Sequence, residues 1–421
     1  MTMSFDAIVV GARVAGASLA YYLAKAGCKV LLLDRATFPS DTLSTHNMFS
    51  NSLGILQEMG VLDAVLATDT ALYRRGRIQF DGAVIDGLFP ETNGIQGCLC
   101  VRRKYLDRIL FEHAKQQPGV TAVEGFKVTS LIRVDGVVTG VEGRRRDGQG
   151  ETERFEAKLV VGADGRLSRV REWVGSERKI SLPTDFASYV AYLSDFRQEG
   201  ETHVEFHKNR DKLAIIFPTS DGQFVVGGMF PLNDIARLER FKANPEAGFR
   251  ELIDEGFGHT TLAERFRDAR FVEPIRGLHG YDNDWYVGMG EGWALLGDAL
   301  TFKDPCVGQG MHDALFGARL LADILSRRPS DEWQGNWASM GEAYQSAMEE
   351  KLMSRFWLGC QFTKNVPVSE EMTAAYSLVG SDRGATGTFL GMYNYASEPE
   401  DLQAEIGRLL ASVHGGASAQ V

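Results

Sequence analysis

The chain has 421 residues, of which 44% are hydrophobic and 24% are charged, a composition typical of a folded protein with room for about two to three domains. Its 45 basic and 56 acidic side chains give a net charge of −11, the wrong sign for a protein whose main task is to bind nucleic acid. Because no run reaches the ~18 apolar residues of a membrane-spanning helix and the N-terminus lacks the pattern of a signal peptide, we expect a cytoplasmic protein without an integral membrane segment.

The first elements form a strand, a glycine-containing loop and a helix. "FDAIVV" (5–10) predicts a buried strand and "VAGASLAYYLAKA" (14–26) a helix. The loop between them has Gly11 and Gly16 of a Gly-x-Gly-x-x-Gly dinucleotide fingerprint but Arg13 at the middle position. The next strand ends in Asp34, 23 residues after Gly11, where an acidic side chain binds adenosine ribose hydroxyls. The complete strand–helix–strand unit predicts a dinucleotide site.

A polar loop, "RATFPSDTLSTHNMF", follows Asp34 and leads into a predicted helix, "NSLGILQEMGVL". Long loops at the carboxyl edge of a parallel sheet are where ligands bind in such folds. His46 in this loop is a candidate contact to a cofactor or a substrate, and a loop histidine without either role is the alternative.

The cysteine and histidine patterns argue against metal sites and disulfides. The five cysteines are scattered and odd in number, which does not suit a disulfide framework. We expect Cys98 and Cys100 at alternate strand positions, because a closed zinc site needs four N or S donors. His203 and His207 lie on a strand in "THVEFHKN", and we expect both in solvent.

Two later motifs combine a strand, a turn and a helix start. "LVVGADGRLSRVR" (159–171) delivers Asp164 into a turn before a helix, and "WALLGDALTFKDPCVGQGMHDAL" (293–315) places Asp298 at a strand end and Gly310 at a helix start. Alternating segments within 183–230 and 268–281 predict an antiparallel sheet. After Ser326 helices are predicted, with an aromatic stretch, "GATGTFLGMYNYAS", that either closes over an apolar pocket or packs in the core.

The first loop and these two motifs, in this order, resemble the single-component FAD-dependent monooxygenases of the para-hydroxybenzoate hydroxylase type, whose superfamily includes geranylgeranyl reductases and flavin halogenases. The resemblance covers roughly residues 5–325. It implies an α/β fold, with a Rossmann-like FAD-binding domain built on a parallel sheet, interleaved with an antiparallel-sheet substrate domain and followed by a helical C-terminal region. The expected parts are 1–180 (FAD-binding, with 72–98 a candidate contribution to the substrate domain), 181–280 (substrate domain), 281–325 (FAD-binding) and 326–421 (helical).

The resemblance also implies roles in FAD binding. The helix opening at Gly16 would present free N–H groups to the pyrophosphate, Asp34 would hold the adenosine ribose, Asp298 the ribityl chain, and the helix near Gly310 the pyrimidine edge of the flavin. In "VRRKYLDRIL" the pattern selects Arg103 ahead of Arg102 for the phosphates, with a solvated helix start as the alternative; for Asp298 the alternative is a turn cap. The candidate cofactor-binding residues are Gly11, Arg13, Ala15, Gly16, Asp34, Arg35, Arg103, Val128, Asp164, Asp298, Pro305, Gly308, Gly310 and Met311.

Arg13 departs from the fingerprint, although arginine occurs at this position in relatives of the resembled family. If Arg13 has helical dihedrals, it needs no glycine, and its guanidinium folds over the pyrophosphate as a charged donor. The alternative is a side chain that faces solvent.

The resemblance implies a monooxygenase that hydroxylates or epoxidises an apolar or aromatic small molecule with NAD(P)H and O2, through a flavin C4a-hydroperoxide. The single fingerprint fits relatives that bind NAD(P)H transiently, no residue is identifiable as catalytic, and the oligomeric state stays open. An isoprenoid double-bond reductase is the first alternative, because "AIIFPTSDGQFVVGG" (214–228) resembles the geranylgeranyl reductases. A halogenase is disfavoured, since Trp-x-Trp-x-Ile-Pro is absent. Asp34, Asp164 and Asp298 argue against a non-enzymatic lipid-group carrier on this fold.

Overall fold

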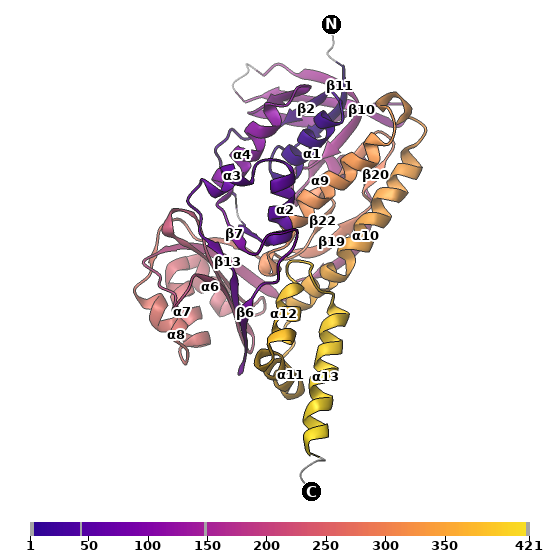
Figure 1. The fold of residues 1–421 in the computed structure, drawn as a ribbon. Helices are drawn as coiled ribbons and strands as arrows, with labels where there is room; N and C mark the ends of the chain where they lie inside the picture. The colour runs from indigo at the N-terminus through magenta and orange to yellow at the C-terminus, as the bar shows by residue number, and fades with distance from the viewer. Residues whose placement is uncertain (1–3, 43, 147–149, 418–421) are drawn as a thin grey trace.

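The computed structural model describes residues 4–42, 44–146 and 150–417, with side chains as far as residue 412. Figure 1 shows an elongated molecule in which the N-terminal strands lie at one end and the helix α13 (Pro399–Ala417) reaches the other. Two eight-stranded sheets form its framework. No helix in these described ranges is long and apolar enough to cross a membrane.

The first sheet has the strand order β20-β21-β11-β1-β2-β8, with the β9–β10 hairpin attached through β11. All neighbours from β21 to β8 pair in parallel, and β20 is antiparallel to β21. Its apolar strands are buried between helices, as parallel strands require, and the predicted parallel sheet is confirmed. The strands are β1 (Ser4–Val10), β2 (Val30–Leu33), β8 (Val120–Val123), β9 (Phe126–Val134), β10 (Val137–Arg145), β11 (Glu153–Gly162), β20 (Met289–Gly290) and β21 (Trp293–Leu295).

Within the described residues, six helices accompany this sheet. The central pair is α1, which begins directly after the glycine loop, and α9, which packs against it; α4 packs on the other side of α1. The helices are α1 (Val14–Lys25), α2 (Ser50–Glu58), α3 (Leu62–Leu66), α4 (Arg103–Lys115), α5 (Arg169–Val174) and α9 (Gly310–Ser326).

The second sheet has the order β17-β13-β16-β15-β14-β5-β6, with β18 beside β13. It is antiparallel, as predicted, except that β14 and β5 pair in parallel. One face packs on α6, α7 and α8, and the other faces the loop before α9 and the C-terminal helices. The elements are β5 (Arg75–Phe80), β6 (Ala83–Leu88), β13 (Phe186–Ser194), β14 (His203–Asn209), β15 (Lys212–Pro218), β16 (Phe224–Pro231), β17 (Arg270–Phe271), β18 (Arg276–Leu278), α6 (Ile235–Ala243), α7 (Pro245–Phe257) and α8 (Thr261–Arg267).

Two three-stranded sheets join the large ones, in the orders β3-β7-β4 and β12-β19-β22. Cys98 and Cys100 occupy alternate positions of β7 and are buried, as expected from the spacing. The strands are β3 (Asn47–Met48), β4 (Leu72–Tyr73), β7 (Cys98–Cys100), β12 (Arg178–Pro183), β19 (Asp282–Tyr286) and β22 (Thr301–Phe302).

The C-terminal helices are α10 (Trp337–Phe362), α11 (Glu370–Ser381), α12 (Arg383–Gly391) and α13. Both α11 and α12 pack on β6, the edge strand of the second sheet. The approach is close enough that a Cβ on Gly380 would lie 2.0 Å from the carbonyl oxygen of Val84. Glycine at this position therefore allows α11 to seal the edge of the sheet.

The expectation that His203 and His207 face solvent is wrong. Both are buried beneath α7 and α8, where His207 Nε2 lies 2.8 Å from a carboxylate oxygen of Glu205. Arg265 of α8 binds the two oxygens of the same carboxylate at 2.7 Å each. The strand alternation was correct, but α7 and α8 cover the face that we expected to be in water. No cluster of described residues could hold a metal ion.

Candidate functional site

The three sequence motifs converge at the carboxyl ends of the neighbouring parallel strands β1, β11 and β21. Gly11 has φ +101°, and a Cβ there would lie 2.3 Å from the carbonyl oxygen of Ala163. A Cβ on Gly297 would lie 3.0 Å from that of Ala15 on α1 and 3.7 Å from that of Ala314 on α9. Only glycines allow the loops to approach so closely, and they bring the first turns of both helices to one place.

The first turn of α1 has no capping side chain. Gly16 lies so close to Gly11 that a Cβ would come within 1.8 Å of its carbonyl oxygen. No side chain caps the helix and its first turn carries no acidic residue, so its N–H groups and positive dipole end remain available.

Arg13 does not meet the condition of helical dihedrals under which we expected it to need no glycine. It is the N-cap residue of α1, with φ −83° and ψ −162°, because the chain must still be extended where it turns into the helix. This conformation needs no glycine. The side chain does not point freely into solvent either, since it forms an ion pair with Asp107 on α4 and a hydrogen bond to Ser40.

Asp34 directly follows β2 and is buried. It accepts hydrogen bonds from the backbone N–H groups of Ala12 and Ala36, both at 2.7 Å. Asp34 thereby ties the glycine loop to β2, while the neighbouring Arg35 is exposed.

Asp164 has a role that the sequence did not reveal. Its carboxylate accepts hydrogen bonds from the Ser168 hydroxyl (2.5 Å) and from the Arg169 N–H (2.7 Å) at the start of α5. It therefore shapes the turn of the second motif. Val128 pairs with Gly143 in the β9–β10 hairpin and is half-buried.

Asp298 lies on the turn Gly297–Ala299, which packs against the first turns of α1 and α9, and we call the space in front of its side chain the recess. Its carboxylate has no hydrogen bond to any described residue, so it does not cap the turn around it. Surrounding protein raises the pKa of Asp298 to about 6, against the opposing charges of Arg103 and Arg166, although the residue remains exposed. The Asp298 carboxyl is accessible and partly desolvated by the surrounding protein, so it is suited to accept hydrogen bonds from a ligand that enters the recess.

The start of α9 completes this side of the site. Gly308 has φ +65°, and a Cβ on Gly310 would meet no atom within 4 Å. The side chain of the N-cap residue Gln309 does not cap the helix and instead donates to the carbonyls of Met392 and Tyr393, both at 3.3 Å. Pro305 begins the short turn before this loop, and Met311 is a buried residue of the first turn of α9. Open space therefore faces an uncapped helix end.

His46 lies at the junction of the two large sheets. It has φ +59°, is fully buried, and its Nε2 is hydrogen-bonded to the hydroxyl of Tyr192 on β13. Burial lowers the pKa of His46 to about 3, which keeps the imidazole neutral. Arg102, which we ranked behind Arg103, stacks on Tyr192 at 4.3 Å and binds Asp41 at 2.7 Å.

The face of the second sheet beside this pair is apolar and closed. Aromatic side chains from β5, β14, α10 and α12 pack against each other around Phe80. A void of only about 10 Å³ remains between the loop before α9 and the C-terminal helices. Its lining residues are Val307, Gln309, Leu358, Phe362, Phe389, Met392 and Tyr393. We call this aromatic cluster and the void beside it the aromatic chamber. The aromatic stretch of the C-terminal region thus contributes both to the core and to the wall of this chamber.

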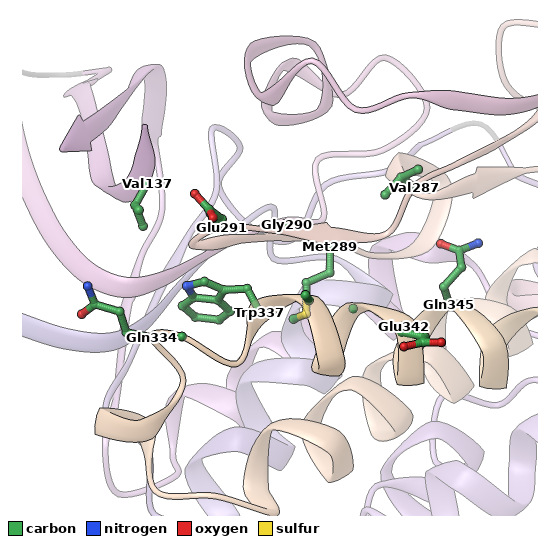
Figure 2. A pocket seen from close by; sticks show the side chains of 12 residues that line it. Val137, Val287, Met289, Gly290, Glu291, Gln334, Trp337, Glu342 and Gln345 are labelled. Carbon is green, nitrogen blue, oxygen red and sulfur yellow. The ribbon is translucent and has the colours of Figure 1, made fainter. Parts of the chain in front are cut away.

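A cavity of about 690 Å³ lies elsewhere, between the β20–β21 hairpin and the start of α10. Figure 2 shows Met289 and Glu291 on one wall and Trp337 and Glu342 on the other. None of the described residues that line it is basic, and it contains no residue of the three motifs. It does not suit a diphosphate, whereas the recess at Asp298 has two helix N-termini and arginines beside it.

A family model described as "FAD binding domain" matches residues 4–329 of this chain. The chain belongs to this family. It is 25% identical over 333 residues to the digeranylgeranylglycerophospholipid reductase of Methanosarcina mazei (77% of this chain, 75% of the relative). It is 26% identical over 353 residues to the 6-methylpretetramide 4-monooxygenase of Streptomyces rimosus (78% and 77%). The flavin-dependent brominase Bmp2 has the same fold, with a TM-score of 0.79, 16% identity, and coverage of 99% and 100%.

The protein is therefore an FAD-dependent oxidoreductase with the fold of the monooxygenase family, which leaves the non-enzymatic carrier without support. The site fits FAD chemically: the uncapped start of α1 suits a pyrophosphate, the unpartnered Asp298 suits hydroxyl groups, and the open space at Gly310 admits a planar ring.

Sequence reasoning missed Asp107 and Tyr192. Asp107 stands four residues after Arg103, the spacing of an ion pair on a helix, so a signal existed. Tyr192 gave none, because its partner His46 is 146 residues away.

Proposed function

We propose that FAD lies across the carboxyl ends of β1, β11 and β21. In this proposal the pyrophosphate binds at the start of α1, Asp34 holds the adenosine ribose, and the β9 backbone at Val128 lies beside the adenine. Asp298 takes the ribityl hydroxyls, and the N–H groups of Gly310 and Met311 bind the pyrimidine edge. Three observations support it: the free α1 terminus, the unpartnered carboxylate of Asp298, and the open space at Gly310.

The first test is direct. The purified protein should be yellow and should release intact FAD when it is denatured, because Cys306 and His312, which flank Gly310 in the sequence, are both buried. Absorbance spectra before and after denaturation check this. A colourless protein that cannot be reconstituted with FAD would overturn the proposal.

We propose that the reaction is a monooxygenation of an apolar or aromatic small molecule, with NAD(P)H as reductant and O2 as oxidant. Bound FAD would supply the redox chemistry and the activation of oxygen. The chain's own contribution is the chamber of aromatic side chains, which would bind an apolar substrate once these side chains move apart, and would exclude water from the reacting atoms. That chamber, adjoining the loop before α9, is the observation that carries the proposal.

The pair of His46 and Tyr192 would orient a polar group of the substrate. His46 is neutral, and its Nδ1 has no partner among the described residues. A buried N–H without an acceptor costs more than a bare lone pair, so we place the imidazole proton on Nε2, where it is donated to the Tyr192 oxygen. The Tyr192 hydroxyl would then be free to donate to an oxygen of the substrate.

A second candidate is the reduction of isoprenoid double bonds. It is favoured by the 25% identity to the digeranylgeranylglycerophospholipid reductase, and an apolar chamber suits a prenyl chain equally well. The distinction lies in oxygen use, because a monooxygenase consumes one O2 for each product and a reductase consumes none.

Rapid mixing of the reduced holoenzyme with O2 separates these candidates without knowledge of the substrate. A monooxygenase should show a transient absorbance distinct from those of reduced and oxidised flavin, because it must hold activated oxygen long enough to transfer it. Direct conversion to oxidised flavin, together with oxygen-independent turnover of a prenyl lipid, would favour the reductase.

A further inference from the structure

Asp107 connects two arginines that the sequence assigns separately to the cofactor. Its carboxylate forms an ion pair with Arg13 Nη1 and accepts a hydrogen bond from Arg103 Nε at 2.9 Å. The Asp107 side chain is 0% exposed. A carboxylate that is completely buried between two guanidinium groups fixes the position of both.

Arg13 and Arg103 differ in how many of their guanidinium nitrogens are already hydrogen-bonded within the protein. Arg13 uses both terminal nitrogens within the protein: Nη1 also lies 3.3 Å from the Ser40 carbonyl, and Nη2 donates to the Ser40 hydroxyl at 2.9 Å. The ring of Phe38 lies 5.7 Å from the guanidinium carbon. Arg13 is thus held by protein groups on three sides, and its side chain is only 28% exposed.

Arg103 binds protein through Nε alone. Its Nη1 and Nη2 have no hydrogen-bond partner among the described residues and are not sealed from solvent, although the side chain is only 12% exposed. Its positive charge acts on Asp298 in the recess. The planar donor edge of Arg103 is therefore free on the side of the candidate cofactor site, and this edge suits a phosphate.

The net charge of Arg13, Arg103 and Asp107 gives Arg13 a role. Arg103 and Asp107 alone would form a neutral pair, which attracts a diphosphate weakly. Arg13 adds a second positive charge, so the three groups together keep one net positive charge. Arg13 therefore has a purpose that does not require contact with the cofactor.

We propose that Asp107 is a positioning residue for FAD binding, which directs the free edge of Arg103 to the FAD phosphates, and that Arg13 acts through Asp107 rather than on the cofactor. Arg13, in the glycine loop, is then the counterion of the buried Asp107 carboxylate. Because Arg13 balances this negative charge, Asp107 can align Arg103 while the site keeps a net positive charge. The proposal rests on FAD binding and is independent of the reaction that the enzyme catalyses.

A double-mutant cycle tests it, with the dissociation constant of FAD measured by flavin fluorescence on the deflavinated protein at several salt concentrations. Arg13→Ala should weaken binding by about 10- to 150-fold, with a smaller dependence on salt. Asp107→Asn should weaken binding by about 10-fold, although it makes the site more positive. In the Asp107→Asn background, removal of Arg13 should change the constant by less than about twofold, because additivity fails for groups that act through each other.

The opposite results overturn the proposal. If the site needs only charge, Asp107→Asn binds FAD as tightly as the wild type or more tightly. If Arg13 contacts the phosphates itself, the two substitutions add. Arg13→Gly restores the usual fingerprint without the charge and should behave as Arg13→Ala; a glycine variant that binds FAD more tightly than the wild type would also contradict the proposal.

Two controls keep the test decisive. Arg240→Ala removes an exposed positive charge on α6 and should leave FAD affinity unchanged. If Asp107→Asn does not fold, the cycle between Arg13→Ala and Arg103→Gln answers the same question, because loss of Arg13 should matter little once Arg103 is gone. Additive losses in that cycle would overturn the proposal.

Discussion

The two sides of the candidate site differ in how their polar groups are used. On the cofactor side, at the ends of β1, β11 and β21, the start of α1 is uncapped and Asp298 has no partner. On the substrate side, the few polar groups are buried and largely paired, as His46 is with Tyr192, and aromatic rings fill the space. The cofactor side is thus ready for a ligand of fixed chemistry, whereas the substrate side is closed until something displaces its side chains.

The largest expected effect is a loss of stability when the packing of the substrate side is disrupted. Phe389→Ala removes a buried ring from the wall of the chamber and should lower the free energy of unfolding by about 3–5 kcal/mol. FAD affinity should change little, since the ring belongs to α12. Urea unfolding and FAD titration check both expectations. Leu167→Ala, at a side chain on the cofactor side that is 76% exposed, is the matched control and should leave stability almost unchanged.

The next effect is a loss of FAD affinity on the cofactor side. Asp298→Ala should weaken FAD binding by about 1.5–3 kcal/mol, the value of a charged hydrogen-bond acceptor, while the protein without FAD stays folded. Titration above pH 7, where the carboxyl is ionised, measures the loss. Asp323→Ala, which removes an exposed carboxylate of α9, should have no effect; undiminished FAD affinity of Asp298→Ala would show that the recess is misassigned.

A smaller effect is expected where the two sides meet. Tyr192→Phe deletes the only hydrogen-bond partner of the His46 ring among the described residues, and an unsatisfied buried group costs about 1–3 kcal/mol. Tyr189→Phe, on the same strand, removes a hydroxyl without a hydrogen-bond partner in the described structure and should be nearly neutral. Equal stability of the two variants in urea would mean that the His46–Tyr192 bond contributes nothing.

The smallest effect is a pH dependence, because Asp298 is exposed and solvent screens much of the shift of its pKa. Desolvation by the surrounding protein raises the pKa of Asp298 to about 6. Ionisation is therefore harder in the folded state than in the unfolded chain, where the pKa is about 3.9. This residue therefore destabilises the FAD-free protein increasingly as pH rises from about 4 to about 7, and the penalty disappears below pH 4. The thermal midpoint of the wild type, compared with that of Asp298→Asn, should fall across this range. A constant difference would contradict the raised pKa.

The sequence allowed the cofactor side to be predicted because its parts are local. A strand end, a turn glycine and a helix start lie within a few residues of one another in each motif, and parallel pairing brings Gly11, Asp164 and Asp298 to one edge. Even there, the sequence did not reveal the partner of the Arg13 side chain, because Asp107 lies 94 residues further along the chain.

The substrate side could not be predicted in the same way. Its contacts join residues far apart in the chain, such as His46 with Tyr192, and its burial depends on which helices cover which face of the sheet. His203 and His207 illustrate the difficulty: alternation places them on one face of β14, but only the position of α7 and α8 decides whether that face is dry.

The contact between Gly380 and β6 has a consequence for solubility. An uncovered edge strand offers a row of unpaired backbone groups to any other chain, and β6 would be such an edge without α11. The matched family region ends at residue 329, before the helices that seal this edge. A fragment cut at that boundary would keep the cofactor motifs but expose both β6 and the aromatic chamber, so it should aggregate rather than remain a smaller flavoprotein.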